Sequence, residues 1–145
     1  MKPSTQRLLL SISLLAATFL PARLSAQATF PQTEGESVRY TANIELPKGY
    51  LSGVCVLLLE DETVKGCLFN EFGITALSFT YSLRRDKVKL HDVVAMMDKW
   101  YIRRVLRRDL KALMHCLQAG TTQYPNERQH ITYKMTPITE QDHGE

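Results

Sequence analysis

The strongest constraint on this fold is that apolar residues recur mostly with the period of a strand and only once with that of a helix. Residues 38–46, 77–83 and 131–135 alternate apolar and polar side chains. This alternation is typical of strands with one buried face. Residues 51–59 are nearly all apolar, which predicts a central strand covered on both faces. Residues 64–69 and 88–94 predict two further strands.

One long amphipathic helix is predicted over residues 95–118. Its apolar row runs through Leu106, Leu110, Leu113 and Leu117 at helical spacing, and Gly120 provides a stop after it. Such a helix and a one-sided sheet each need a partner to bury their apolar faces. The sequence therefore predicts an α+β fold, a curved antiparallel β-sheet of about five to six strands packed on one long amphipathic α-helix.

The first 28 residues have the three parts of a secretory signal peptide. Lys2 and Arg7 precede an apolar run over residues 8–20, and small residues follow. Cleavage after Ala26 or after Ala28 fits the small-x-small rule, and an uncleaved N-terminal anchor is the alternative. The run is shorter than a bilayer-spanning helix. We therefore expect a periplasmic or secreted protein.

The remaining chain is the size of one domain and carries balanced charge. The whole chain has 18 basic and 15 acidic residues, but residues 1–28 hold three basic residues and no acid. Without them the charges balance, so the composition predicts no nucleic-acid partner. We expect a flexible leader over residues 29–37, a single domain over 38–136 and a disordered tail over 137–145.

The sequence has none of the spacings that the common site chemistries require. The four histidines lie far apart, and no Cys-x-x-Cys pair is present, so we expect no metal site. No serine or cysteine lies in a recognised nucleophile motif, and no glycine cluster could cradle a phosphate. The sequence therefore predicts a protein that is not an enzyme and has no cofactor.

Three cysteines in an oxidising compartment permit at most one internal disulfide. Cys55 and Cys67 flank a predicted hairpin turn at nearly equal distances, so a cross-strand disulfide forms if their side chains face each other. The alternative is two buried thiols that act as small apolar residues.

The predicted helix is strongly basic on the sides that do not carry its apolar row. A cationic face could dock on an acidic protein or on a membrane surface. The alternative is a solvated outer face whose arginine stems cover apolar surface. The candidate docking residues are Arg103, Arg104, Arg107, Arg108 and Lys111.

The apolar side of the sheet provides a second candidate site. If one helix leaves part of this face uncovered, the remainder forms a groove for a lipid or an acylated protein. A filled core is the alternative. The residues expected on this face are Leu77, Phe79, Tyr81, Leu106 and Leu110.

About half of the chain after the predicted signal peptide, residues 51–113, resembles the LolA/LolB-type group of periplasmic carriers. The resemblance lies in three short segments, namely Ser52-Gly53-Val54, Asn70-Glu71-Phe72-Gly73 and Phe79-Thr80-Tyr81. It implies a curved antiparallel sheet around helices and a carrier of lipids or lipoproteins. This chain departs from the group in being shorter, in having a late main helix and in lacking a lipid-anchoring cysteine. A binding or carrier protein for a hydrophobic ligand is therefore the first functional hypothesis, and an interaction module using the basic helix is the second.

Overall fold

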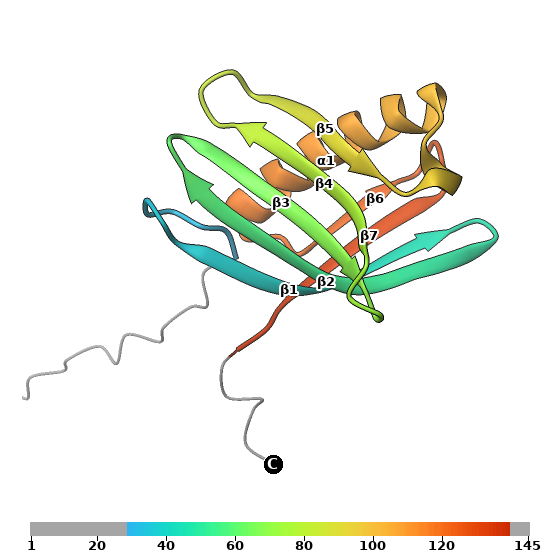
Figure 1. Cartoon of the computed structure of the whole chain (residues 1–145), viewed down its shortest axis with the longest axis horizontal. Helices are drawn as coiled ribbons and strands as arrows, with labels where there is room; N and C mark the ends of the chain where they lie inside the picture. Colours follow the sequence, from blue (N-terminus) through green and yellow to red (C-terminus); the bar gives the residue numbers. More distant parts are fainter. Residues whose placement is uncertain (1–28, 140–145) are drawn as a thin grey trace, which may run out of the picture.

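The computed structural model describes residues 29–139, which form an antiparallel sheet around one helix (Figure 1). The sheet has the strand order β5-β4-β3-β2-β1-β7-β6. Only the last two strands follow the helix in the chain. The elements are β1 (Ser37–Leu46), β2 (Gly49–Glu60), β3 (Thr63–Asn70), β4 (Thr75–Ser82), β5 (Lys87–Val93), the short 3-10 helix η2 (Ala95–Met97), α1 (Trp100–Gln118), β6 (Gln123–Asn126) and β7 (Ile131–Pro137).

The sheet curls into a half-barrel, and α1 lies on its concave side (Figure 1). Register shifts at Leu68/Phe69 and between Leu77 and Phe79 interrupt the two outer ladders on one side. Such irregularities bend a sheet and increase its twist. Both edge strands, β5 and β6, contact α1. The predicted α+β architecture with an antiparallel sheet and one helix is confirmed.

Two details of the predicted architecture are wrong. The described residues form seven strands instead of five or six, because β6 adds a short strand where the sequence predicts a polar loop around Pro125. An edge strand pairs on one side only, so it tolerates the missing N–H of proline. The helix begins at Trp100 instead of residue 95, because Lys99 is extended and residues 95–97 form a separate 3-10 turn.

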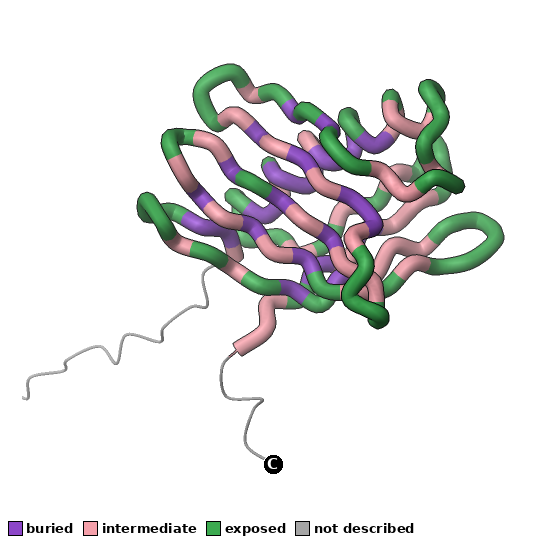
Figure 2. The backbone as a smooth tube through the Cα atoms, viewed as in Figure 1, coloured by how far each residue is buried: buried purple, intermediate pink, exposed green. Residues whose placement is uncertain are grey.

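The period of two is visible as alternating burial along the strands (Figure 2). On β2, Cys55, Leu57 and Leu59 are buried against α1. Val56 and Leu58 are half-buried on the convex face, because no second layer from residues 29–139 lies there. The prediction that residues 51–59 are covered on both faces is therefore wrong.

The segment predicted as a flexible leader packs on the domain. Phe30 is buried in the core, and the Tyr40 hydroxyl donates to the Thr29 carbonyl oxygen at 2.6 Å. The Thr29 hydroxyl donates to the carbonyl oxygen of Leu117, the last core residue of α1, at 2.7 Å. This segment therefore joins the sheet to the end of the helix.

The predicted C-terminal tail also begins within the folded part. β7 extends to Pro137, and the N–H of Ile138 donates to the carbonyl oxygen of Arg39. The rest of the predicted tail from residue 140 and the predicted signal peptide lie outside the described residues.

Gly66 on β3 lies directly under the ring of its cross-strand partner Phe79 on β4. A Cβ atom at position 66 would lie 2.2 Å from Phe79 Cζ, far inside van der Waals contact. The glycine therefore makes room for an aromatic ring that is itself 2% exposed.

We expect Gly66→Ala to lower the free energy of unfolding by about 1–3 kcal/mol, because the added methyl group must displace the Phe79 ring within a packed core. Urea denaturation monitored by circular dichroism measures this change. Gly49→Ala is the matched control, since nothing lies within 4 Å of a Cβ atom there. Equal stability of the two variants would show that the ring moves without cost.

Candidate functional site

Three arginines on the outer face of α1 have no acidic partner. Arg104, Arg107 and Arg108 are exposed and form no ion pair within residues 29–139. Their i, i+3 and i+4 spacing places them on one side of the helix. Of the five predicted docking residues, the other two are partly neutralised, because Arg103 pairs with Asp98 and Lys111 pairs with Asp86 at 3.3 Å.

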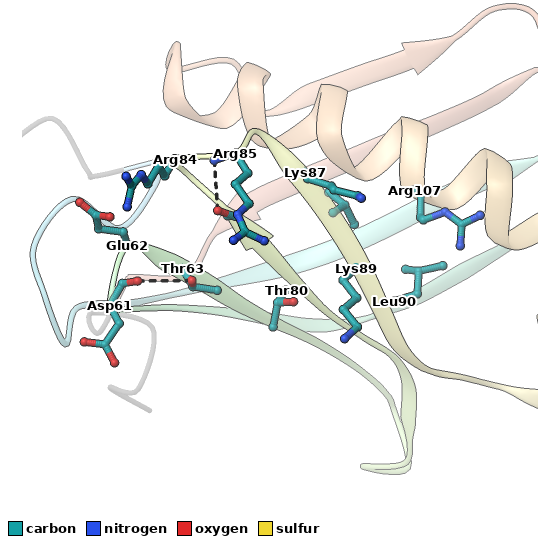
Figure 3. A pocket seen from close by; sticks show the side chains of 12 residues that line it. Asp61, Glu62, Thr63, Thr80, Arg84, Arg85, Lys87, Lys89, Leu90 and Arg107 are labelled. Carbon is teal, nitrogen blue, oxygen red and sulfur yellow. Dashed lines mark hydrogen bonds between the residues drawn. The ribbon is translucent and has the colours of Figure 1, made fainter.

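Further cations come from the β4–β5 turn and from the edge strand β5. Lys87 and Lys89 are both exposed on β5, and neither forms an ion pair within the described part of the chain. Together with Arg107 they line an open depression of about 1000 Å³ (Figure 3). We name the following seven residues the basic surface: Arg84, Arg85, Lys87, Lys89, Arg104, Arg107 and Arg108.

The depression also has an acidic margin. Asp61 and Glu62 line it at the β2–β3 turn, on the side where Arg84 lies (Figure 3). Both acids have positive φ angles, 50° and 58°, in a two-residue hairpin loop of the kind that fits the twist of the strands. The depression is therefore basic along β5 and α1 and acidic at one end.

Asp86 ties the β4–β5 turn to the helix. Its carboxylate accepts a hydrogen bond from the Tyr81 hydroxyl at 2.6 Å and lies 2.6 Å from His115 Nε2. These hydrogen bonds lower the pKa of Asp86 to about 2. Burial, followed by the bond to Asp86, raises the pKa of Tyr81 to about 12. This network fixes the cations of the turn beside those of α1.

The Asp86–His115 pair resembles two members of a hydrolytic triad, but no nucleophile from the described part of the chain completes it. The hydroxyl that reaches the pair belongs to Tyr81, and it donates to the carboxylate instead of to the imidazole. A nucleophile that is activated by histidine has to donate a hydrogen bond to a nitrogen of the imidazole ring. Among residues 29–139, no three His, Cys, Asp or Glu side chains are grouped so that they could hold a metal ion.

A second acid, Asp109, is completely buried on the inner face of α1. Its carboxylate accepts hydrogen bonds from Asn126 Nδ2 at 2.8 Å and from the Tyr133 hydroxyl at 2.7 Å. Burial and the adjacent carboxylate raise the pKa of Tyr133, so its hydroxyl remains a donor. Tyr124 stacks on Tyr133 with ring centroids 6.1 Å apart. This network attaches the helix to β6 and β7.

The five residues predicted to line a hydrophobic ligand site do come together, but in a closed core. Each is at most 7% exposed, and only about 20 Å³ of space is left between the sheet and α1. A drug-sized ligand needs roughly 300–1,000 Å³. Helix α1 therefore covers this face of the sheet, and the space between them is a filled core instead of a groove. These residues are Leu77, Phe79, Tyr81, Leu106 and Leu110.

The disulfide suggested between Cys55 and Cys67 is absent, and all three cysteines are free. Cys55 pairs with Leu68, whereas Cys67 pairs with Val56, so the two side chains point to opposite faces of the sheet. Burial raises the pKa of the Cys55 thiol to about 12, which keeps it protonated and unreactive. Cys67 lies on the convex face beside Val56 and Phe69, where they line a shallow apolar depression of about 590 Å³.

The contribution of β5 and its turn to the basic surface was missing from the sequence-based prediction. Residues 84–87 are recognisable as a charged turn, and Lys87 and Lys89 alternate with buried Val88 and Leu90. Alternation shows that these lysines face solvent. Only the packing of β5 against α1 shows that they lie next to Arg107.

Comparisons of the chain with protein-family models, with curated proteins and with solved structures found no match. The resemblance to LolA/LolB-type carriers therefore stays a prediction. Within the described part of the chain, no helix has both the length and the apolar character needed to cross a membrane.

We expect Tyr133→Phe to destabilise the fold by about 1–3 kcal/mol, because Asp109 loses one of its two donors while it remains buried. Thermal or urea unfolding measures the loss. Tyr124→Phe is the matched control, since its hydroxyl makes no hydrogen bond with the described residues. If Tyr133→Phe is as stable as the control, the hydroxyl does not stabilise the buried carboxylate.

We expect Asp86→Asn to lower the unfolding midpoint at neutral pH but not near pH 2. The pKa of Asp86 in the folded protein, about 2, lies below its ordinary value of 3.8. Its stabilising effect is therefore present above pH 4 and lost as the pH falls through 2. Unfolding curves at a series of pH values test this expectation.

Asp61→Asn is the control for Asp86→Asn, because Asp61 also occupies a turn with positive φ and its carboxylate accepts no hydrogen bond from the described residues. A pH-independent difference between Asp86→Asn and the wild type would contradict the assignment of the network to an ionised Asp86.

Proposed function

We propose that this chain is an exported, non-enzymatic interaction domain that binds an acidic segment of a partner protein through the basic surface. The observation that carries the proposal is the meeting of cations from a turn, an edge strand and a helix around one depression. Five of the seven cations of the basic surface line it, and Arg104 and Arg108 lie beside Arg107 on the same side of the helix. None of the seven forms an ion pair within residues 29–139.

The arrangement of these cations supports a role in binding a partner instead of a role in solubility alone. Like charges repel when they are held together, and Asp86 holds the turn against α1 through His115 and Lys111. The surface is therefore maintained in one arrangement before a partner arrives. Pre-arranged charge raises association rates and selects partners of the opposite sign.

The shape of the site favours an extended acidic chain over a small anion. The cations are distributed along the open depression, and Asp61 and Glu62 form its far margin. A small polyanion such as a phosphate would need donors that converge on one point. An acidic segment can instead run along β5 and α1 and stop before the acidic margin. The edge position of Lys87 and Lys89 also discourages direct strand addition, because lysines protect sheet edges.

Carriage of a lipid or acylated protein is less well supported by the geometry. The face predicted to bind the ligand is filled by α1, so a carrier would have to displace the helix. Displacement would break the hydrogen bonds of Asp109 to Asn126 and Tyr133. The hydrophobic-ligand hypothesis therefore requires an opening motion in addition to a ligand.

We expect Lys87→Glu/Arg107→Glu to weaken binding to immobilised poly-L-glutamate roughly tenfold or more, because each reversal replaces attraction with repulsion at the depression. Surface plasmon resonance measures the affinity. Binding of the wild type should fall as the salt concentration rises from about 0.01 to 0.15 M, since the Debye length shortens from about 30 to 8 Å.

Arg39→Glu/Arg128→Glu is the control, because both arginines are exposed, lie outside the basic surface and change the net charge equally. Equal losses in the two double variants would mean that net charge alone drives binding. Absence of any binding by the wild type at low salt would reject the acidic partner.

A further inference from the structure

Among the described residues, the most exposed large apolar side chains lie at the end of the sheet opposite the β4–β5 turn. In this antiparallel sheet, the β1–β2 turn, the β3–β4 turn and the connection from β5 to α1 all lie at the same end, together with the β6–β7 turn. Figure 1 shows these three connections projecting from that end of the half-barrel. We name the six exposed apolar residues on these connections or within two residues of them the apolar rim: Tyr50, Phe72, Ile74, Met96, Trp100 and Tyr101.

The exposure of these six residues sets them apart from the rest of the described surface. They are 49–79% exposed, whereas the other exposed large apolar residues, Leu46, Val54 and Leu83, are 36–40% exposed. Single exposed apolar residues are normal, but a cluster of the largest ones at one end marks an interaction site. The rim therefore needs a partner that accepts apolar side chains.

The rim is held in place by ordered turns. The Asn70 side-chain oxygen accepts hydrogen bonds from the N–H groups of Phe72 at 3.0 Å and Ile74 at 2.9 Å. Gly73 between them has φ of 75°, which closes the turn with both apolar side chains outward. Trp100 and Tyr101 pack edge to face with centroids 5.8 Å apart. The exposed side chains are thus pre-arranged.

Cations without an acidic partner flank the aromatic residues of the rim. Lys48, Lys99 and Arg104 form no ion pair within residues 29–139. Two nearby acids are neutralised, because Glu45 pairs with Lys134 and Asp98 pairs with Arg103. Three further acids form no ion pair within the described residues, namely Glu71 at the β3–β4 turn, Asp92 near the end of β5 and Glu127 at the β6–β7 turn. Cations interleaved with aromatic and aliphatic tips complement an apolar layer covered by anionic groups.

We propose that the apolar rim binds the interface of a membrane that contains anionic phospholipids. Tryptophan and tyrosine favour the boundary between head groups and acyl chains, because their rings are apolar and their polar atoms stay hydrated. Three separate tips with charges between them suit a deformable lipid surface better than one flat protein interface. The rim shares only the neighbouring Arg104 with the basic surface, and Arg104 does not line the depression, so this inference stands independently of the proposed acidic partner.

The single tryptophan of the chain makes the rim directly observable. Trp100 is the only tryptophan, and it is 75% exposed. On adding phosphatidylcholine vesicles that contain phosphatidylglycerol, we expect its fluorescence to shift to shorter wavelength and to be shielded from an aqueous quencher. Vesicles of phosphatidylcholine alone should give a weaker effect at the same lipid concentration.

Tyr50→Ser/Phe72→Ser tests the other two tips while leaving the tryptophan reporter intact. We expect at least a roughly tenfold loss of affinity for the mixed vesicles, because two large side chains no longer leave water. Leu83→Ser at the opposite end is the control and should bind as the wild type does. Circular dichroism confirms that each variant is folded.

Each variant is compared both as the full chain and after removal of residues 1–28, because the apolar run over residues 8–20 would itself insert into vesicles and hide a loss at the rim. No shift of Trp100 fluorescence on either vesicle, or wild-type affinity in Tyr50→Ser/Phe72→Ser, would overturn the proposal. Equal binding to both vesicles would overturn the role of anionic lipids. A concentration-dependent shift without vesicles would identify a second copy of the chain as the occupant instead.

Discussion

The burial of one face of α1 in the concave sheet is the interaction on which the rest of this structure depends. A single helix has to cover the inner faces of seven strands, and the sheet curls until both of its edge strands contact that helix. Leu113, Met114 and Leu117 are nearly inaccessible in this contact. Asp109 defines the position of α1 on the sheet, because a buried carboxylate is tolerated only where hydrogen-bond donors reach it. Leucines could slide along the sheet, whereas this carboxylate fixes the helix against β6 and β7.

Because the position of the helix is fixed, the charged and aromatic side chains on its other sides lie at defined places on the surface. The side toward β5 brings Arg107 next to Lys87 and Lys89, and Lys111 and His115 meet Asp86 there. The N-terminal end brings Trp100 to the same end of the molecule as the β1–β2 and β3–β4 turns. The proposed surfaces are thus consequences of the packing that closes the core.

Hydrophobic periodicity was sufficient to predict strands β1 to β5, strand β7 and the presence of one amphipathic helix. It was insufficient where the structure of a segment depends on its tertiary contacts. β6 has four residues and a proline, too short to display a period, and it exists because β7 offers it an edge. The apolar run of β2 does not reveal whether a second layer exists, since Val56 and Leu58 are half-buried without one.

The candidate sites also contain features that the sequence predicted and features that depend on tertiary contacts. The basic residues of α1 were recognisable from the sequence, but their partners were not, because Asp98 and Asp86 neutralise two of them through tertiary contacts. The register that separates Cys55 from Cys67 was equally hidden. Trp100 and Arg107 lie about 10 Å apart along the helix axis at 1.5 Å per residue, more than one Debye length at physiological salt. A membrane at the rim would therefore attract Arg104 more strongly than Arg107, leaving the depression beside β5 free to select an acidic partner.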